Sequence, residues 1–188
     1  MKIPYLSIVI PAHNEEIRLP LAFKKIEDFI KKQKFSYEVI VVENGSRDRT
    51  VDVTKEFIKS HPHTRLISVE TRGKGLAVKA GMLAAVGERR FICDADLSMP
   101  IDEIAKFFKA IDNGFDVVIG SREGKDAKRI GEPFHRHLMG RVLNFIIKAV
   151  ALQGVEDTQC GFKMFTKKAA EDLFNVQKMT GIGFDIEL

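Results

Sequence analysis

Short apolar runs alternate along the chain with longer segments in which apolar residues recur every three or four positions. The short runs predict buried strands, at 6–10, 39–42, 66–69, 91–93, 117–120 and 162–165. The longer segments predict helices, at about 19–32, 48–59, 75–85, 100–111 and 134–152. Strands that alternate with helices of this length indicate parallel β-α-β units, so we expect a single α/β domain over residues 1–188.

Polar side chains follow four of these predicted strands, at the point where each strand ends. They are Asn14 and Glu15, Glu43 and Asn44, Asp94 and Asp96, and Arg122. Because the carboxyl ends of parallel strands meet at one edge of a sheet, we expect these side chains to border one crevice. Each of them alone is also typical of turns and helix caps, as Asn44-Gly45 illustrates. Their coincidence favours a ligand site.

Asp94 and Asp96 lie between the apolar run 91–93 and Pro100. Carboxylates at the end of a buried strand are costly to pack unless a cation or hydrogen-bond donors accompany them. Oxygen ligands of this kind suit Mg²⁺ or Mn²⁺, which commonly bridge carboxylates to substrate phosphates. Alternatively, one aspartate of this D-x-D pattern caps the following helix and the other faces water.

Composition narrows the range of partners. The chain is 45% hydrophobic with a formal net charge of only +4, which suits one full core and gives no strong signal for nucleic acid. It has no Trp, and its basic residues are not interleaved with aromatic ones, so we expect no nucleic-acid partner.

We expect Cys93 and Cys160 to be reduced and buried, as in a cytoplasmic protein. We also expect no secretory leader and no membrane span, since no apolar run approaches about 20 residues.

Other phosphate and hydrolase motifs fit poorly. Residues 72–75, Arg-Gly-Lys-Gly, precede a predicted helix but lack the spacing of a dinucleotide fingerprint or a P-loop. No G-x-S-x-G is present, and the five histidines lack zinc spacing, so we expect them at the surface. A Mg²⁺-dependent phosphatase with a D-x-D-x-[TV] motif remains an alternative, although Ser98 stands where that pattern has Thr or Val and the motif follows the fourth strand. A nucleotide-sugar binding module without catalysis is another.

Six segments in order resemble a known family. Residues 10–16, 42–46 and 94–96 are similar to the conserved segments of family 2 glycosyltransferases, which have the GT-A fold, a Rossmann-like nucleotide-diphospho-sugar transferase fold with a mainly parallel sheet flanked by helices. Residues 72–75, 157–163 and 184–188 resemble the dolichyl-phosphate β-glucosyltransferases, with the dolichyl-phosphate mannose synthases as near cousins. The resemblance implies an inverting, metal-dependent transfer of a hexose to a polyprenyl or dolichyl phosphate.

By this resemblance, Pro11, Ala12, Asn14 and Glu15 would border the nucleoside of the donor, and Glu43 would hold its base or ribose. Asp96, helped by Asp94, would hold Mg²⁺ or Mn²⁺ on the diphosphate. The other donor-site residues would be Asn44, Gly45, Lys74, Ala95 and Arg136. Many relatives have Asp-Asp-Gly-Ser where residues 43–46 are Glu-Asn-Gly-Ser. UDP-glucose is therefore the favoured donor, and GDP-mannose stays open.

The remaining predictions concern catalysis and the acceptor. Arg122 and Arg136 would serve phosphate groups, because a guanidinium pairs with phosphate in bidentate fashion; a solvated charged loop is the alternative for 121–133. By the resemblance, Asp157 would position the acceptor. Asp185 and Glu187 are weaker candidates for this role, because they lie at a chain end expected to fray.

The helix at 134–152 is more apolar than one buried stripe requires. It would contact the cytoplasmic face of a membrane, form a homodimer or lie in the core. The family pattern continues past residue 188, so the sequence is expected to be a truncated fragment or an unusually short enzyme.

Overall fold

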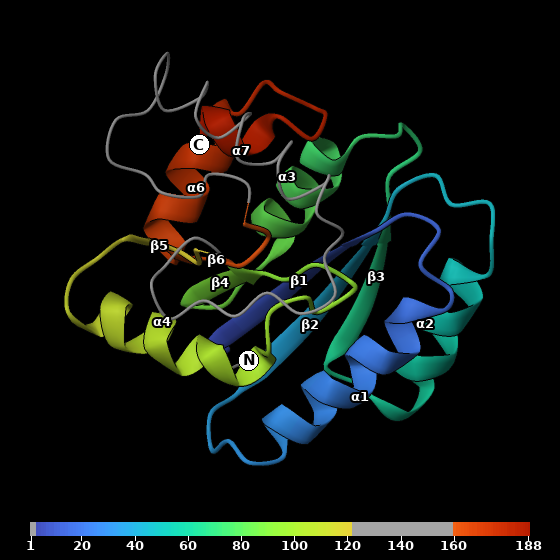
Figure 1. Cartoon of the computed structure of the whole chain (residues 1–188), viewed down its shortest axis with the longest axis horizontal. Helices are drawn as coiled ribbons and strands as arrows, with labels where there is room; N and C mark the ends of the chain where they lie inside the picture. The colour runs from blue at the N-terminus through green and yellow to red at the C-terminus, as the bar shows by residue number, and fades with distance from the viewer. Residues whose placement is uncertain (1–2, 122–159) are drawn as a thin grey trace, which may run out of the picture.

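A computed structural model of the chain describes residues 3–121 and 160–188. Its six-stranded sheet has the order β3-β2-β1-β4-β6-β5 (Figure 1). The pairs β1–β2, β2–β3 and β1–β4 are parallel, whereas β6 is antiparallel to both β4 and β5. The strands are β1 (Leu6–Ala12), β2 (Tyr37–Glu43), β3 (Thr64–Ser68), β4 (Arg89–Ile92), β5 (Val117–Ile119) and β6 (Lys163–Thr166).

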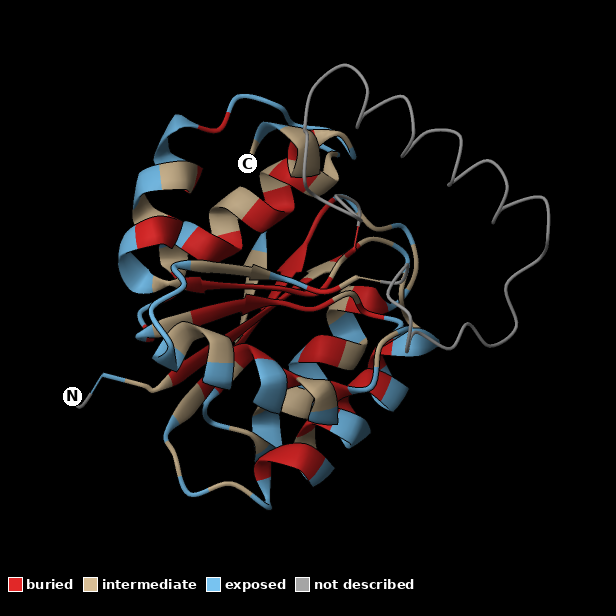
Figure 2. Ribbon diagram, turned by 60° about the vertical axis from the view of Figure 1, so that its left-hand side comes forward, coloured by how far each residue is buried: buried red, intermediate tan, exposed pale blue. Residues whose placement is uncertain are grey.

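Helices cover both faces of the sheet, so the inner strands β1, β2, β4 and β6 are largely buried, whereas the edge strands β3 and β5 are partly exposed (Figure 2). One apolar layer lies beneath α1 (Arg18–Ile30), α2 (Thr50–Ser60) and α4 (Ile104–Asp112), with a 3₁₀ turn at Ile101–Glu103. The other lies beneath α3 (Lys74–Ala84), α6 (Lys167–Val176) and α7 (Phe184–Glu187). Strand β1 alternates between them: Ile8 and Ile10 face the first layer and Val9 the second. This two-sided burial explains why the strands appear in the sequence as continuous apolar runs.

The order of strands and helices agrees with the sequence analysis in the described ranges, with two informative differences. Strand β1 does not stop before Pro11 but continues to Ala12, pairing with β2 as far as Glu43. Strand β4 pairs with β1 only up to Val9, so Pro11 lies where that side of β1 has no ladder to interrupt. Helix α6 was missed, although Thr166 at its N-cap accepts a hydrogen bond from the Ala169 amide.

Cys93 and Cys160 are both free and buried, as expected. No helix within residues 3–121 and 160–188 is long and apolar enough to cross a membrane. The predicted loop at 121–133, apart from Ser121, and the predicted helix at 134–152 lie outside the described residues.

Candidate functional site

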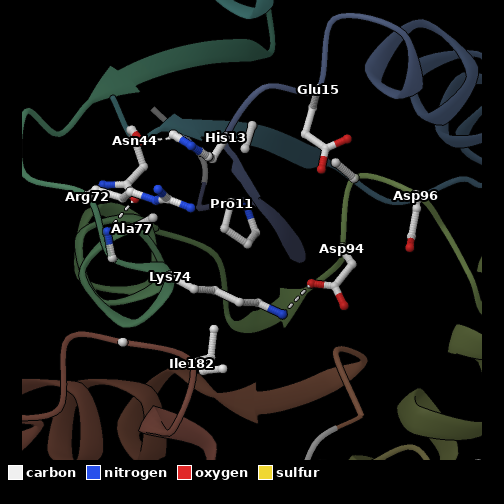
Figure 3. A pocket seen from close by; sticks show the side chains of 14 residues that line it. Pro11, His13, Glu15, Asn44, Arg72, Lys74, Ala77, Asp94, Asp96 and Ile182 are labelled. Atoms are coloured by element: carbon white, nitrogen blue, oxygen red, sulfur yellow. Dashed lines mark hydrogen bonds and ion pairs between the residues drawn. The ribbon is translucent and has the colours of Figure 1, made fainter. Parts of the chain in front are cut away.

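A cavity of about 570 Å³ opens where β1 and β4 end, and we call it the main cavity (Figure 3). Its walls come from the turn after β1, the start of α3, the turn after β4 and the segment before α7. Eight of its lining residues are ones predicted for the site from the sequence: Pro11, Ala12, Glu15, Asn44, Lys74, Asp94, Ala95 and Asp96. Six further lining residues were not predicted for it: His13, Arg72, Gly73, Ala77, Gly181 and Ile182.

A smaller cavity of about 330 Å³, the side cavity, shares His13 and Arg72 with the main one. It is lined in addition by Asn14, Gly45, Arg47 and Glu70. The predicted convergence of the ends of β1, β2 and β4 therefore occurs in the structure. The predicted site residues Arg122, Arg136 and Asp157 lie outside the described residues, and their roles remain predictions.

Asp94 is held between a lysine and a glycine. Lys74 Nζ lies 2.8 Å from Asp94 Oδ1. On the other side, a Cβ placed on Gly161 would lie only 1.7 Å from Asp94 Oδ2, so only glycine fits there. Burial disfavours the charge on Lys74, but Asp94, and then Asp185 and Asp96, outweigh it and raise the pKa of Lys74. Lys74 is therefore a cation at neutral pH.

Asp96 is exposed at the mouth of the main cavity. Its Oδ1 accepts a hydrogen bond of 3.0 Å from the Ser98 amide, and its other oxygen has no hydrogen-bond partner among the described residues. Burial raises the pKa of the neighbouring Glu15; Arg18 opposes this, and the charges of Asp96 and Asp48 add to it. The arrangement brings three carboxylates, those of Glu15, Asp94 and Asp96, to one side of the cavity (Figure 3).

The donor set fits a cation shared with a ligand. Within the described ranges, no three acidic, His or Cys side chains are grouped closely enough to enclose a metal ion. Asp94 and Asp96 offer carboxylate oxygens from one turn, which leaves other coordination positions for water or phosphate. Mg²⁺ is usually bound in this way, by one or two carboxylates and substrate phosphates.

A second, buried ion pair lies behind the first. Lys163 on β6 pairs with Asp185 on α7, and their side chains are only 2% and 6% exposed. Burial raises the pKa of Asp185, while Lys163 and, less strongly, Lys74 oppose the rise. The pair joins α7 to the strand that lies beside β4.

The end of the chain is docked, which corrects the expectation that it frays. Phe184 is 1% exposed, and the Glu187 carboxylate accepts hydrogen bonds from the amides of Lys178 and Met179, at 2.7 and 2.6 Å. The segment before these residues is also fixed by contacts distant in sequence, since the carbonyls of Thr180 and Gly181 accept hydrogen bonds from the first turn of α3.

The two glycines in residues 72–75 are required because the segment before α7 packs closely against them. A Cβ on Gly73 would lie 2.4 Å from the Thr180 carbonyl oxygen, and one on Gly75 would lie 2.5 Å from that of Met179. The amides of Gly75 and Leu76 donate to the carbonyls of Gly181 and Thr180, each at 3.2 Å. Because these two amides already donate hydrogen bonds to protein carbonyls, they are not available to bind a phosphate group.

Glu43 and Asn44 are predicted to contact the donor, and in the structure both side chains also make internal hydrogen bonds. The Asn44 amide donates to the Thr71 carbonyl at 2.5 Å and accepts from the Gly73 amide at 2.6 Å, which fixes the turn before α3. Glu43 is buried, accepts from the Ser46 amide and lines neither cavity. Asn44 remains part of the cavity wall.

His13 was expected at the surface, but it is half-buried and lines both cavities. Its Nδ1 is 2.7 Å from the Asn44 carbonyl oxygen, which can only accept, so Nδ1 carries the hydrogen. In the neutral ring Nε2 is then an acceptor, and the Asn14 amide nitrogen lies 3.4 Å from it. Its position between Ala12 and Asn14, both predicted site residues, could have identified His13 as a site residue from the sequence.

Comparisons with known proteins agree with this geometry. The profile of the family described as Glycosyl transferase family 2 matches residues 7–174. The chain is 36% identical over 200 residues to a dolichyl-phosphate beta-glucosyltransferase of Drosophila melanogaster, covering 97% of this chain and 61% of that protein. It is 32% identical over 183 residues to a dolichol-phosphate mannosyltransferase of Pyrococcus furiosus, covering 96% of this chain and 50% of that one. The chain thus spans about three fifths of the length of its glucosyltransferase relatives.

Among solved structures, glucosyl-3-phosphoglycerate synthase from Mycobacterium tuberculosis in complex with phosphoglyceric acid superposes with a TM-score of 0.71. The match covers 97% of this chain and 63% of the other at 20% identity, so it informs the fold alone. It supports the predicted GT-A fold, with its mostly parallel sheet and flanking helices. From the family match, the chain belongs to glycosyl transferase family 2.

Proposed function

We propose that the chain is the catalytic part of an inverting, metal-dependent hexosyltransferase that uses UDP-glucose and a polyprenyl or dolichyl phosphate. The observation that carries this proposal is the meeting of Asp94 and Asp96 with Pro11 and Ala12 around one cavity. Relatives named dolichyl-phosphate beta-glucosyltransferase support the sugar and the lipid phosphate.

Asp94 and Asp96 would hold Mg²⁺ or Mn²⁺ against the donor diphosphate. A structure of the mycobacterial synthase described as a complex with Mn²⁺, UDP and glucosyl-3-phosphoglycerate supports such a metal. The bound cation would stabilise the negative charge that develops on the leaving diphosphate. Lys74 and Arg72 line the same cavity and would add positive charge beside the diphosphate.

The acceptor needs little help to become a nucleophile. A phosphate monoester has a second pKa of about 6, so its oxygen is largely anionic at neutral pH. A general base, often worth about 10²–10⁴-fold for a hydroxyl acceptor, is then mostly unnecessary. We therefore propose a single displacement with inversion, in which Asp157 positions the acceptor while Arg122 and Arg136 contact phosphate groups. The enzyme would work at the cytoplasmic face of the membrane that carries its lipid, touching it through 138–152.

GDP-mannose is the second candidate donor, because a dolichol-phosphate mannosyltransferase is among the relatives. The identities of Glu43 and Asn44 leave both donors open, and the internal hydrogen bonds of these side chains favour neither donor.

The test is transfer of radiolabelled sugar from UDP-glucose or GDP-mannose to dolichyl phosphate, with Mn²⁺ or with a chelator. We expect a metal-dependent β-linked glucosyl lipid. Asp96→Ala should lower its rate at least about 100-fold, as for loss of a main electrostatic contact in a transition state. Asp102→Ala, a nearby exposed aspartate, is the matched control. An α-linked product would refute the single displacement, and hydrolysis of p-nitrophenyl phosphate without transfer would favour the phosphatase alternative.

A further inference from the structure

Lys74 occupies an unusual place for a cation beside a metal site. Its side chain extends from the start of α3 along the main cavity, and its ammonium group contacts Asp94, one of the two aspartates of the D-x-D (Figure 3). Asp96 and Asp185 also lie close enough to interact with it electrostatically. In the structure, then, the position next to Asp94 Oδ1 already holds a positive charge.

The backbone that carries Lys74 is fixed on both sides. The Gly73 amide donates to Asn44 Oδ1 at 2.6 Å, and the Gly75 amide donates to the Gly181 carbonyl. Neither flanking glycine has room for a Cβ. Movement is therefore left to the lysine side chain, a flexible four-carbon stem with a single ammonium group at its end.

The charges around this cavity favour joint binding of a cation and an anion. Among the described residues, Asp94, Asp96 and Asp185 face two ammonium groups, Lys74 and Lys163, which leaves one net negative charge. Glu15 at the rim is already paired with Arg18, and Arg72 adds one positive charge, so the charges around the cavity are nearly balanced. A divalent metal alone would make the net charge of the cavity positive, and a doubly charged nucleoside-diphosphate sugar alone would make it negative. The two together leave it unchanged.

Resting on the proposed function, we propose that Lys74 is a built-in competitor for the metal position on Asp94. While the donor site is empty, Lys74 pairs with Asp94. With metal and donor bound together, Asp94 would hold the metal and the Lys74 ammonium would pair with the donor diphosphate instead. Metal and nucleotide therefore strengthen each other's binding, and Lys74 supplies part of that coupling.

The alternative is a purely structural bridge between α3 and the turn after β4. The two explanations predict different affinities for a metal ion when no nucleotide is present. A competitor suppresses it, so removing the ammonium should strengthen it, whereas loss of a structural bridge would leave it unchanged or weaken it.

The experiment measures Mn²⁺ binding by the full chain, by electron paramagnetic resonance of free Mn²⁺, with and without UDP. For the wild type we expect weak binding of Mn²⁺ alone and at least about tenfold tighter binding with UDP, within the usual range of coupling between sites. Lys74→Met should bind Mn²⁺ alone about five- to tenfold more tightly, and UDP should then tighten it by a correspondingly smaller factor.

Two controls separate charge from packing. Lys74→Arg keeps the cation and should behave as the wild type. Lys168→Met removes an equal charge from an exposed ion pair with Asp172 on α6 and should also leave Mn²⁺ binding unchanged. If Lys74→Met does not fold, as judged by circular dichroism, Lys74→Gln serves in its place.

Unchanged or weaker binding of Mn²⁺ alone by the folded Lys74 variant would overturn this inference. That result differs from a failure of the proposed function, in which the wild type itself would bind neither UDP nor Mn²⁺ and this inference would fall with it.

Discussion

The buried Lys163–Asp185 pair allows a quantitative test of how the site is supported. Lys163→Met keeps the length of the side chain but removes its charge, which leaves the Asp185 carboxylate in a site where it is only 6% exposed. Breaking a buried pair by removing one partner costs about 3–5 kcal/mol. We expect the free energy of unfolding, from urea denaturation at neutral pH, to fall by that amount. Lys168→Met, in an exposed pair, should cost less than about 1 kcal/mol.

The pH dependence of this loss follows from the sign of the pKa shift. Burial already raises the pKa of Asp185 in the folded chain, and loss of Lys163 raises it further. A carboxyl group whose pKa is higher in the folded chain than in the unfolded chain binds more protons when folded. Its destabilising effect is therefore smallest at low pH and grows as the pH rises through the folded-state pKa. The deficit of Lys163→Met should therefore be smaller at about pH 5 than at about pH 8.

A double variant, Lys163→Met with Asp185→Leu, removes both charges and should recover most of the loss, since apolar replacements of buried pairs are often neutral. A loss below about 1 kcal/mol for Lys163→Met, or a deficit that does not change with pH, would refute the reasoning, because the pair would then behave as an exposed one.

Three further predictions use other contacts. Gly161→Ala forces a methyl group against Asp94, so it should cost about 1–3 kcal/mol of stability in urea denaturation and weaken Mn²⁺-dependent UDP binding in calorimetry; wild-type values would contradict the close approach. Asn44→Ala leaves the Gly73 amide and Thr71 carbonyl without their partner and should cost about 1–3 kcal/mol in the same assay, with wild-type stability as the contrary result. Burial, then Asp94 and Asp96, hold the pKa of the Cys93 thiol well above its usual value, so a thiol reagent should label it only after unfolding; rapid labelling of the native chain would contradict this.

The part of the site that could be predicted is the part fixed by local pattern and sheet topology. Asp94 and Asp96 follow an apolar run, and parallel strands bring their ends together with those of β1 and β2, so the meeting of Glu15, Asn44, Asp94 and Asp96 at one cavity was predictable from the strand pattern. Even Pro11, which was expected to end its strand, marks the place where β1 loses one neighbour.

What could not be predicted depends on contacts between distant segments. Asn44 was assigned to the donor because it follows a strand, but its amide is taken by a turn more than 25 residues later. The docking of residues 180–188 on α3 has no local signal. Lys163 lies in a predicted buried strand, but nothing near it in the sequence identifies Asp185, 22 residues later, as its partner. The antiparallel insertion of β6 between β4 and β5 likewise depends on pairing across the whole fold.

The most direct test of the central claim is calorimetric titration of the chain with UDP-glucose, with Mn²⁺ and then with a chelator. If Asp94 and Asp96 hold a metal on the donor diphosphate, UDP-glucose should bind at least about tenfold more tightly with Mn²⁺. This gain should disappear in Asp96→Ala and persist in Asp102→Ala. Equal affinity with and without metal, or an undiminished gain in Asp96→Ala, would contradict the account.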